Sequence, residues 1–321
     1  MQARRPPMRR RSLLGLAATL PLPALAQGNR PLRLVVPFPP GGTADLLGRL
    51  AAQQIEARLG APVVVENRAG AGGAIGSDMV ARGPADGSTI LLSNIASQAI
   101  GPAVNPSVPY NPVTDFRHIA LVAAVPSAIA VSATGPIRTM AELIARAKAG
   151  AGAVRFGSTG IGTSSHVKLE LLKRAAGVDI THVPYRGSAP ATADVIGGQV
   201  EGLIAAVPDI GRNDRLRLLA ITLPERAARW PDVPTVAEAG FPTLVATNWF
   251  GLSGPAGMPA AIAQQINAAV VEGLNTPALV DRLATLGAPA NRMSPADYTA
   301  MVASEVSRWA DVVKTAGITA A

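Results

Sequence analysis

Two glycine-rich loops are the parts of the sequence whose residue types and spacing could do chemistry. The first, Pro39-Pro40-Gly41-Gly42-Thr43, precedes an amphipathic run. The first N–H groups of a helix lack partners inside it, and the helix dipole adds partial positive charge there. Because glycine leaves those donors uncovered, we expect an anion site at Gly41, Gly42 and Thr43, walled by Phe38. The alternative is an ordinary turn between a strand and a helix.

The second loop, from Gly157 to His166, also leaves a strand and enters a helix. It comes near the phosphate-binding pattern G-x-x-x-x-G-K-[ST], but Thr163 stands where the lysine should be, so a triphosphate is not expected. Neutral N–H and hydroxyl donors suit a carboxylate better; the alternative is a loop that is only flexible. The candidate ligand-binding residues here are Ser158, Gly160, Gly162, Thr163, Ser164, Ser165 and His166.

Two further positions are candidates for ligand contact. Ser93 and Asn94 follow a predicted strand, and strand ends in open α/β sheets face the ligand crevice. Asp45 lies in the first turn of the helix after the first loop, where a carboxylate favours the dipole; alternatively it accepts an ammonium group of an amino-acid ligand. If the two glycine-rich loops lie on opposite sides of one ligand cleft, they would hold the two ends of a small dianion.

Other motifs carry less chemistry. Gly70 to Gly76 resembles a dinucleotide fingerprint, but Ile75 stands where the pattern requires glycine. The three histidines are scattered and lack metal-site spacing. Phe156 replaces the first glycine of G-x-S-x-G around Ser158, and no spacing supports a catalytic triad. We therefore expect a binding protein with no catalytic residue, metal or cofactor, and not an enzyme.

The loops require a framework of short strands alternating with helices, and the sequence predicts one. Apolar runs predict strands at 32–36, 63–65, 89–92, 128–131, 154–156, 180–183, 200–205 and 216–222. Helices are predicted at 43–59, 75–81, 139–148, 164–175 and 189–196, and at the end of the chain at 259–274, 277–286 and 295–316, the last capped by Ser294. This alternation favours an α/β fold with parallel sheets flanked by helices.

The terminal helices need a surface to pack on, and the simplest solution returns the chain to the first lobe. We therefore expect two α/β lobes with a cleft between them, joined by crossovers near Leu121 to Pro126 and near Asn248 to Pro255. Residues 27–124 with 251–321 would form lobe 1, and residues 125–250 would form lobe 2.

The first 26 residues have the pattern of an export signal. Five arginines precede a short apolar core, and Ala24-Leu25-Ala26 is a cleavage site before Gln27. Arg10-Arg11 also resembles a twin-arginine signal, so the general and twin-arginine export routes both stay open.

Removing five of the 29 basic residues leaves 24 against 21 acidic ones, a net charge of +3, so no nucleic-acid binding is expected. The chain has no cysteine, which excludes disulfides and thiolate sites.

Long segments of the chain resemble the Bug family, the extracytoplasmic receptors of tripartite tricarboxylate transporters. They are VVPFPPGGTADLLGRLAAQQI, VVVENRAGAGGAIGSDMVARGPADGSTILLSN, FGSTGIGTSSHVKLELL, THVPYRGSAPATADVIGGQV and DVPTVAEAGFP. The resemblance covers nearly all of the chain after residue 26. It implies a two-lobed periplasmic-binding-protein fold of type II-like form, with mixed sheets and a cleft whose binding loops map onto Phe38 to Asp45, Ser93-Asn94 and Ser158 to His166.

The resemblance also implies a function. Such receptors bind small carboxylates (dicarboxylates, tricarboxylates, acidic amino acids or aromatic acids) and deliver them to a membrane permease, here as a periplasmic monomer. Two alternatives stay open at this point. One is a periplasmic sensor that feeds a signalling partner, and the other is a secreted hydrolase, which turnover of a carboxylated substrate would reveal.

Overall fold

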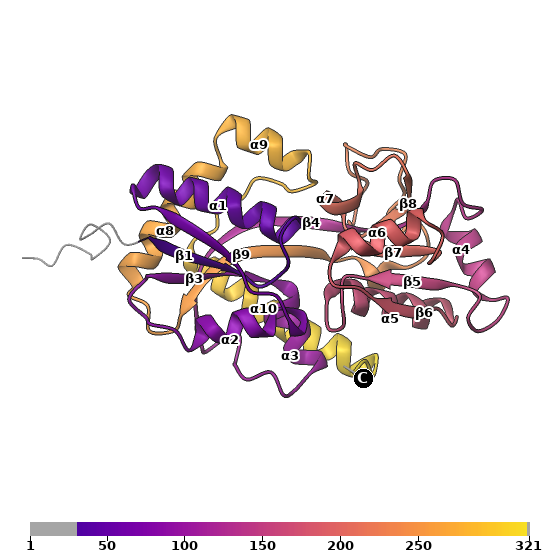
Figure 1. The fold of residues 1–321 in the computed structure, drawn as a ribbon, viewed down its shortest axis with the longest axis horizontal. Helices are drawn as coiled ribbons and strands as arrows, with labels where there is room; N and C mark the ends of the chain where they lie inside the picture. Colours follow the sequence, from indigo (N-terminus) through magenta and orange to yellow (C-terminus); the bar gives the residue numbers. More distant parts are fainter. Residues whose placement is uncertain (1–30, 320–321) are drawn as a thin grey trace, which may run out of the picture.

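Within residues 31–319, which a computed structural model describes, nine strands are joined by hydrogen bonds, and eight of them form one path through both halves of the molecule (Figure 1). The order is β2-β1-β3-β9-β4-β7-β5-β6, and β8 also pairs with β4. The strands are β1 (Leu32–Val36), β2 (Val63–Asn67), β3 (Thr89–Asn94), β4 (Phe116–Ser132), β5 (Arg155–Ser158), β6 (Thr181–Pro184), β7 (Gly202–Ala206), β8 (Leu216–Ile221) and β9 (Thr247–Pro255).

Helices flank these strands. They are α1 (Thr43–Leu59), α2 (Ala74–Ala81), α3 (Gly101–Val104), α4 (Met140–Ala147), α5 (Ser164–Ala176), α6 (Ser188–Ile196), α7 (Val207–Ile210), α8 (Ala260–Leu274), α9 (Pro277–Ala284) and α10 (Pro295–Thr315). The predicted elements are all present, with ends that differ by a few residues. The sequence did not predict α3, α7, β9 or the first part of β4.

The two halves of the path are both mixed sheets. In the first half β1 pairs in parallel with β2 and β3, and β9 enters antiparallel between β3 and β4. In the second half β5 pairs in parallel with β6 and β7, and β4 pairs antiparallel with β7 and β8. The parallel pairs follow from strand–helix–strand connections, which place helices on the sheet faces.

Two long strands connect the halves. β4 pairs with β9 from Phe116 to Pro126, and from Ser127 onward it pairs with β7. The two segments predicted as crossovers, near 121–126 and 248–255, both lie inside these strands, which run side by side. The pairing register shifts twice within β4, between His118 and Ala120 and between Leu121 and Ala123.

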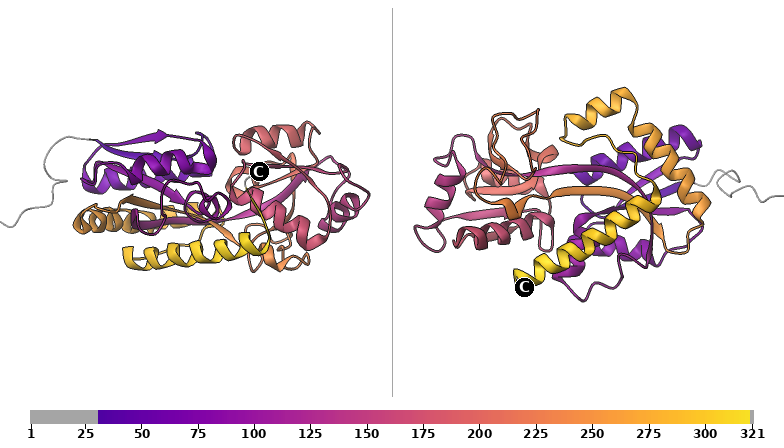
Figure 2. Two further views of the ribbon diagram at one scale, coloured as in Figure 1. Left: turned by 90° about the horizontal axis from the view of Figure 1, so that it is seen from below. Right: turned by 180° about the vertical axis from the view of Figure 1, so that it is seen from behind.

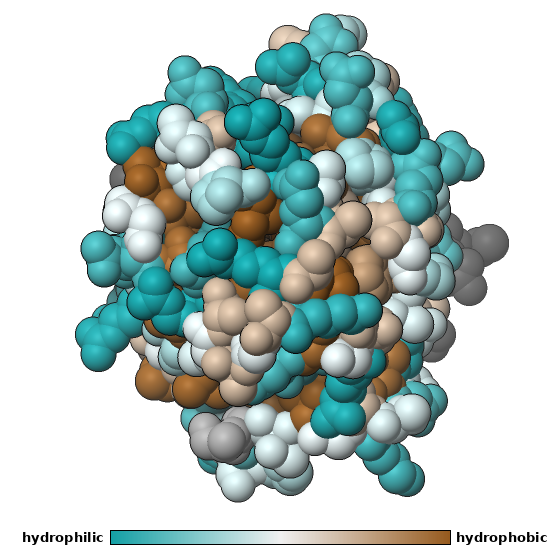
Figure 3. All heavy atoms as spheres, turned by 90° about the vertical axis from the view of Figure 1, so that its right-hand side faces the viewer, coloured by the Kyte–Doolittle hydropathy of each residue, from teal (hydrophilic) through white to brown (hydrophobic). Residues whose placement is uncertain are grey.

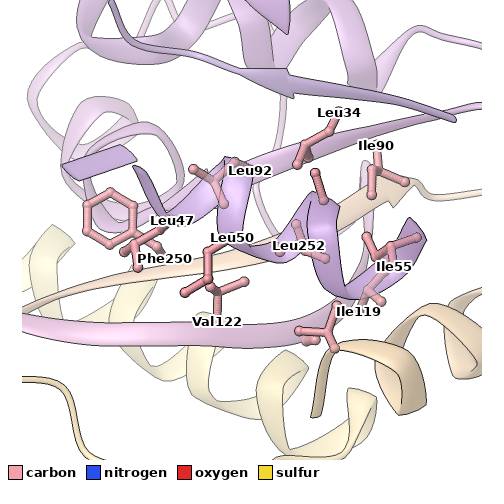
Figure 4. Close-up of a cluster of buried hydrophobic side chains, with 14 of the residues drawn as sticks. Leu34, Leu47, Leu50, Ile55, Ile90, Leu92, Ile119, Val122, Phe250 and Leu252 are labelled. Atoms are coloured by element: carbon pink, nitrogen blue, oxygen red, sulfur yellow. The ribbon is translucent and has the colours of Figure 1, made fainter. Parts of the chain in front are cut away.

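The core of the first half lies between α1 and its sheet. Leu47, Leu50 and Ile55 of α1 point toward the sheet that carries Leu92 (Figure 4). Burying each such side chain contributes roughly 1.5–3 kcal/mol relative to leaving it exposed. Gly48 makes the close packing possible, since a Cβ atom there would lie 2.7 Å from Val36 Cγ2.

The three terminal helices return to the first half. Ile262 and Ile266 of α8 share the core of α1, and α10 begins with a capping box in which Ser294 Oγ accepts from Asp297 N at 3.1 Å. This confirms the predicted cap at Ser294. α10 runs along the first half toward the second (Figure 2), where Arg308 Nη2 donates to Val245 O at 3.0 Å.

The outer end of the second half carries hydrophilic side chains interspersed with hydrophobic ones (Figure 3). In the part of the chain that the structure describes, no helix is both long and apolar enough to cross a bilayer. The predicted export signal at residues 1–26 lies outside the described residues.

Candidate functional site

A cavity of about 180 Å³ lies where the two halves meet. Its walls are the loops after β1, β3 and β5 and the start of α6, and its floor includes Ser127 of β4 and Asn248 of β9. This volume is below the roughly 300–1,000 Å³ of pockets that hold drug-sized ligands, so the cavity suits a small molecule.

The first predicted loop forms one wall. Phe38, Gly41, Gly42 and Thr43 all line the cavity. Gly41 has a φ of +87°, a conformation that favours glycine, and its N–H donates to Asp45 Oδ2 at 3.1 Å.

Asp45 holds this loop in place from behind and does not line the cavity. Its carboxylate also accepts from Arg49 Nε at 3.0 Å and from Asn67 Nδ2 at 3.1 Å. Burial acts against the charged form, but the hydrogen bonds from Arg49, Gly41 and Asn67 outweigh it and lower the pKa of Asp45. With all these partners inside the protein, Asp45 is not placed to accept an ammonium group from a ligand.

A carboxylate of the protein itself occupies the N-terminus of α1. Asp209 Oδ1, from α7 of the second half, accepts from Thr43 N at 2.7 Å and from Thr43 Oγ1 at 2.6 Å. The sequence predicts a ligand anion at this helix end, and the carboxyl group that lies there in the structure is that of Asp209. Burial raises the pKa of Asp209 although the bonds from Thr43 and Ser188 oppose that change.

The second predicted loop is a network of hydroxyl groups. Thr163 Oγ1 donates to Gly160 O at 2.6 Å, Thr159 N donates to Ser165 Oγ at 2.9 Å, and Thr163 Oγ1 lies 3.0 Å from Ser165 Oγ. Thr163, Ser164 and Ser165 line the cavity. Ser164 Oγ is buried and has no hydrogen-bond partner within residues 31–319, so this residue of the cavity wall carries a donor without an acceptor.

Two stacked histidines support this loop from behind the cavity. The His166 and His182 rings lie 4.4 Å apart at an angle of 19°. His166 Nδ1 accepts from Gly162 N at 3.3 Å, and His182 Nε2 lies 2.6 Å from Ser158 Oγ. Burial lowers the pKa of both rings, that of His182 to about 4, so both are neutral at pH 7.

The end of β3 and the segment after it contribute Asn94, Ile95 and Ala96 to the cavity wall. Asn94 Oδ1 accepts from Ser97 N at 2.9 Å. Ser93 belongs to a buried chain of hydroxyl groups, with its Oγ 3.1 Å from Tyr298 Oη and 2.8 Å from Ser253 Oγ. His118 Nδ1 extends that chain at 2.9 Å from Ser253 Oγ.

The structure brings eight of the fourteen predicted ligand-binding residues to the cavity wall. These are Phe38, Gly41, Gly42, Thr43, Asn94, Thr163, Ser164 and Ser165. Gly160 lines a neighbouring hollow that shares Phe38 and Pro39 with the cavity. The other five, Asp45, Ser93, Ser158, Gly162 and His166, lie behind the wall and hold it.

Sequence reasoning missed several lining residues. Ser188 lies in a third glycine-containing strand-to-helix segment, so the same pattern that identified the other loops could have found it. Asp209 lies in α7, three residues after the end of β7, and strand ends face the crevice. Ser127 and Asn248 lie inside strands and carry no motif. Among the described residues, no cluster of histidines, cysteines or acidic residues could hold a metal ion.

Two α/β halves joined by paired strands, with a small cavity between them, are the architecture of a two-lobed solute-binding protein. The chain belongs to the TctC family, the tripartite tricarboxylate transporter family receptor, which matches residues 47–318. It is therefore a periplasmic solute-binding protein of a transport system, and not an enzyme.

Relatives and solved structures agree with this assignment. The chain is 38% identical over 307 residues to Protein BugT of Bordetella pertussis, covering 94% of each chain. Rpa4515 of R. palustris with adipate is 35% identical with a TM-score of 0.87, covering 91% of this chain and 99% of that one. MatC of Rhodopseudomonas palustris with bound malate is 32% identical with a TM-score of 0.84, covering 88% and 99%. The predicted family and fold class are confirmed.

Proposed function

We propose that this protein captures a small dicarboxylate in the cavity between its lobes and delivers it to the membrane permease of a tripartite tricarboxylate transporter. The observation that carries the proposal is Ser164, which lines the cavity and whose buried Oγ has no hydrogen-bond partner among residues 31–319. The bound malate and adipate of the two solved relatives support the same ligand class.

The charges around the cavity support an anionic ligand with two ends. The N-terminus of α5 and the hydroxyl groups of the second loop would hold one carboxylate. Arg186, an exposed residue that lines the cavity, would attract the other from solvent. The carboxyl group of Asp209 lies at the N-terminus of α1 and lines the cavity. It would repel a ligand carboxylate at that position, so ligands with a negative charge beside α1 should bind less well.

We further propose that the lobes close on the ligand by bending of β4 and β9. The lobes would be residues 27–124 with 251–321, and residues 125–250, as predicted from the sequence. The bonds between Thr43 and Asp209 join the two lobes, so they are among the contacts that a closed form gains. We also propose that residues 1–26 are removed on export.

The ligand can be identified directly. The exported protein is purified without dialysis, its intact mass is compared with that of a chain starting at Gln27, and small molecules released on unfolding are identified by mass spectrometry. A stoichiometric dicarboxylate supports the proposal. If the protein is released empty and neither malate, adipate nor an acidic amino acid stabilises it, the proposal fails.

A substitution in the first loop tests the location. Gly42 has an extended backbone, and its added Cβ would lie 3.9 Å from Asp209 Oδ1, so the γ-methyl groups of valine would enter the cavity. We expect Gly42→Val to weaken dicarboxylate binding at least tenfold in isothermal titration calorimetry. Ala57→Val, which adds the same bulk at an exposed position of α1, should leave binding unchanged.

A further inference from the structure

We propose that the floor of the cavity is an additional anion-binding subsite, in which Ser127 donates its hydroxyl proton to an anionic oxygen of the ligand and Lys168, buried behind it, positions that donor. The proposal rests on the proposed function, because it names the residues that meet the ligand where the two lobes join. Ser127 lies on β4, Lys168 on α5, and their common neighbour Asn248 on β9.

The hydrogen bonds fix the direction of the Ser127 proton. Ser127 Oγ accepts from Lys168 Nζ at 2.9 Å and from Asn248 Nδ2 at 2.8 Å. A hydroxyl oxygen has two lone pairs, and both are now used, so the oxygen can act toward any further group only as a donor. Among the described residues no acceptor receives that proton, and Ser127 lines the cavity.

The three side chains are rigidly held. Lys168 Nζ also donates to Asn248 Oδ1 at 3.3 Å, which closes a triangle of hydrogen bonds. The backbone of Ser127 is bound on both sides by Thr222, whose Oγ1 accepts from Ser127 N at 2.9 Å and whose N–H donates to Ser127 O at 2.9 Å. A donor held in this way loses little conformational freedom when a ligand arrives.

Lys168 lacks a counter-charge of its own. Its side chain is fully buried, and within residues 31–319 it forms no ion pair. The charged groups that face it are Arg308 and Glu305 of α10. The carboxylate of Glu305 accepts hydrogen bonds from Arg308, Trp249 and Trp309, and it forms no ion pair with Lys168.

The missing counter-charge makes a ligand anion the natural complement of this subsite. Burial lowers the pKa of Lys168 to about 7, with Arg308 adding to the effect. An anionic oxygen on Ser127 would favour the ammonium form, so binding near pH 7 would take up protons. Such a ligand would also contact both strands that connect the lobes.

Titration calorimetry of the full-length protein with sodium malate and sodium adipate tests the subsite. Measurements at pH 7 in two buffers of different ionisation enthalpy give both the Kd and the number of protons taken up. We expect Ser127→Ala to raise the Kd at least tenfold. Lys168→Met should raise it similarly and abolish the proton uptake, whereas the exposed control Lys148→Met should change neither.

The outcomes separate this subsite from the proposed function. If the wild-type protein binds and Ser127→Ala binds equally well, the subsite is refuted while the proposed function stands. If Lys168→Met does not fold, Ser127→Ala still decides, because it removes one oxygen atom and leaves the lysine in place. If the wild-type protein binds neither these two ligands nor any other carboxylate, both proposals fail.

Discussion

At the scale of single residues, the site contains several hydroxyl groups at helix starts, and one of them, Ser164 Oγ, has no hydrogen-bond partner among the described residues. The sequence predicted the glycines and hydroxyls of both loops because each has a local cause, a helix start without blocking side chains. It could not predict Ser127 or Asn248, because inside a strand a polar residue acquires its role only from the strand beside it. Ser93 was predicted to contact the ligand, but strand pairing directs its side chain into the core, where its Oγ lies beside Tyr298 Oη.

Replacing Ser164 by alanine should lower the affinity for the ligand without lowering the stability of the fold. Its hydroxyl has no partner in the described structure, so no internal hydrogen bond is lost. A bond from this group to a carboxylate would contribute about 1.5–3 kcal/mol, so the Kd for a bound dicarboxylate should rise at least tenfold. Calorimetry of Ser164→Ala measures this, and Ser304→Ala on the exposed face of α10 is the control. A drop in stability with unchanged affinity would contradict the assigned role.

The charge of Asp209 should make the protein less stable at neutral pH than at acid pH, relative to an uncharged variant. Burial raises its folded-state pKa, so its contribution is fully present below the unfolded pKa and is lost as pH rises through the folded value. Asp209→Asn keeps an oxygen for Thr43 but removes that dependence. Urea unfolding at pH 4 and pH 7 should show the variant gaining stability over wild type as pH rises; an equal difference at both pH values would argue against it.

At the scale of elements, the period of apolar residues predicted helices and parallel strands well, because helices on both faces leave short continuous apolar runs in the buried strands. It failed for β9 and the first part of β4. These strands carry glycine and proline, among them Gly251, Gly254 and Pro126, which interrupt the apolar runs typical of a buried strand. Antiparallel pairing between two distant segments tolerates such residues, and only the tertiary structure brings the segments together.

Packing of α1 on β1 should depend on the absence of a side chain at Gly48. Gly48→Ala improves helix propensity by up to about 1 kcal/mol, but its Cβ would meet Val36 Cγ2 at 2.7 Å. Overpacking typically costs about 1–3 kcal/mol, so the free energy of unfolding should fall. Urea unfolding checks this, and Val36→Ala in the same chain should restore part of the loss. If Gly48→Ala alone raises the free energy of unfolding, α1 must be able to move away from Val36 without loss of packing.

At the scale of the whole molecule, buried neutral histidines couple stability to pH. Burial lowers the pKa of His118 to about 4, and its ring lies between Ser253 Oγ and Pro112 O. The unfolded chain takes up this proton near pH 6.5 and the folded chain does not, so stability should fall as pH drops from about 6.5 to 4, by roughly 3 kcal/mol for this group.

Unfolding by urea at pH 7.0 and pH 4.5 measures that fall. His118→Gln should be less stable than wild type at pH 7.0, because it loses part of the buried chain of hydrogen bonds, yet it should show a shallower dependence on pH. Burial also lowers the pKa of His182 to about 4, so His182 makes stability fall in the same direction as pH drops. The His118→Gln variant should therefore keep part of the pH dependence of its stability. Parallel slopes for the two proteins would show that His118 is not the group responsible.

The position of β9 in the sheet also governs how the chain can be made. β9 lies between β3 and β4 but follows them in sequence by more than a hundred residues, so the first half lacks its central strand until Thr247–Pro255 has been synthesised. Contacts between such distant segments slow folding. A nascent chain of 240 residues would therefore still be without a complete first sheet.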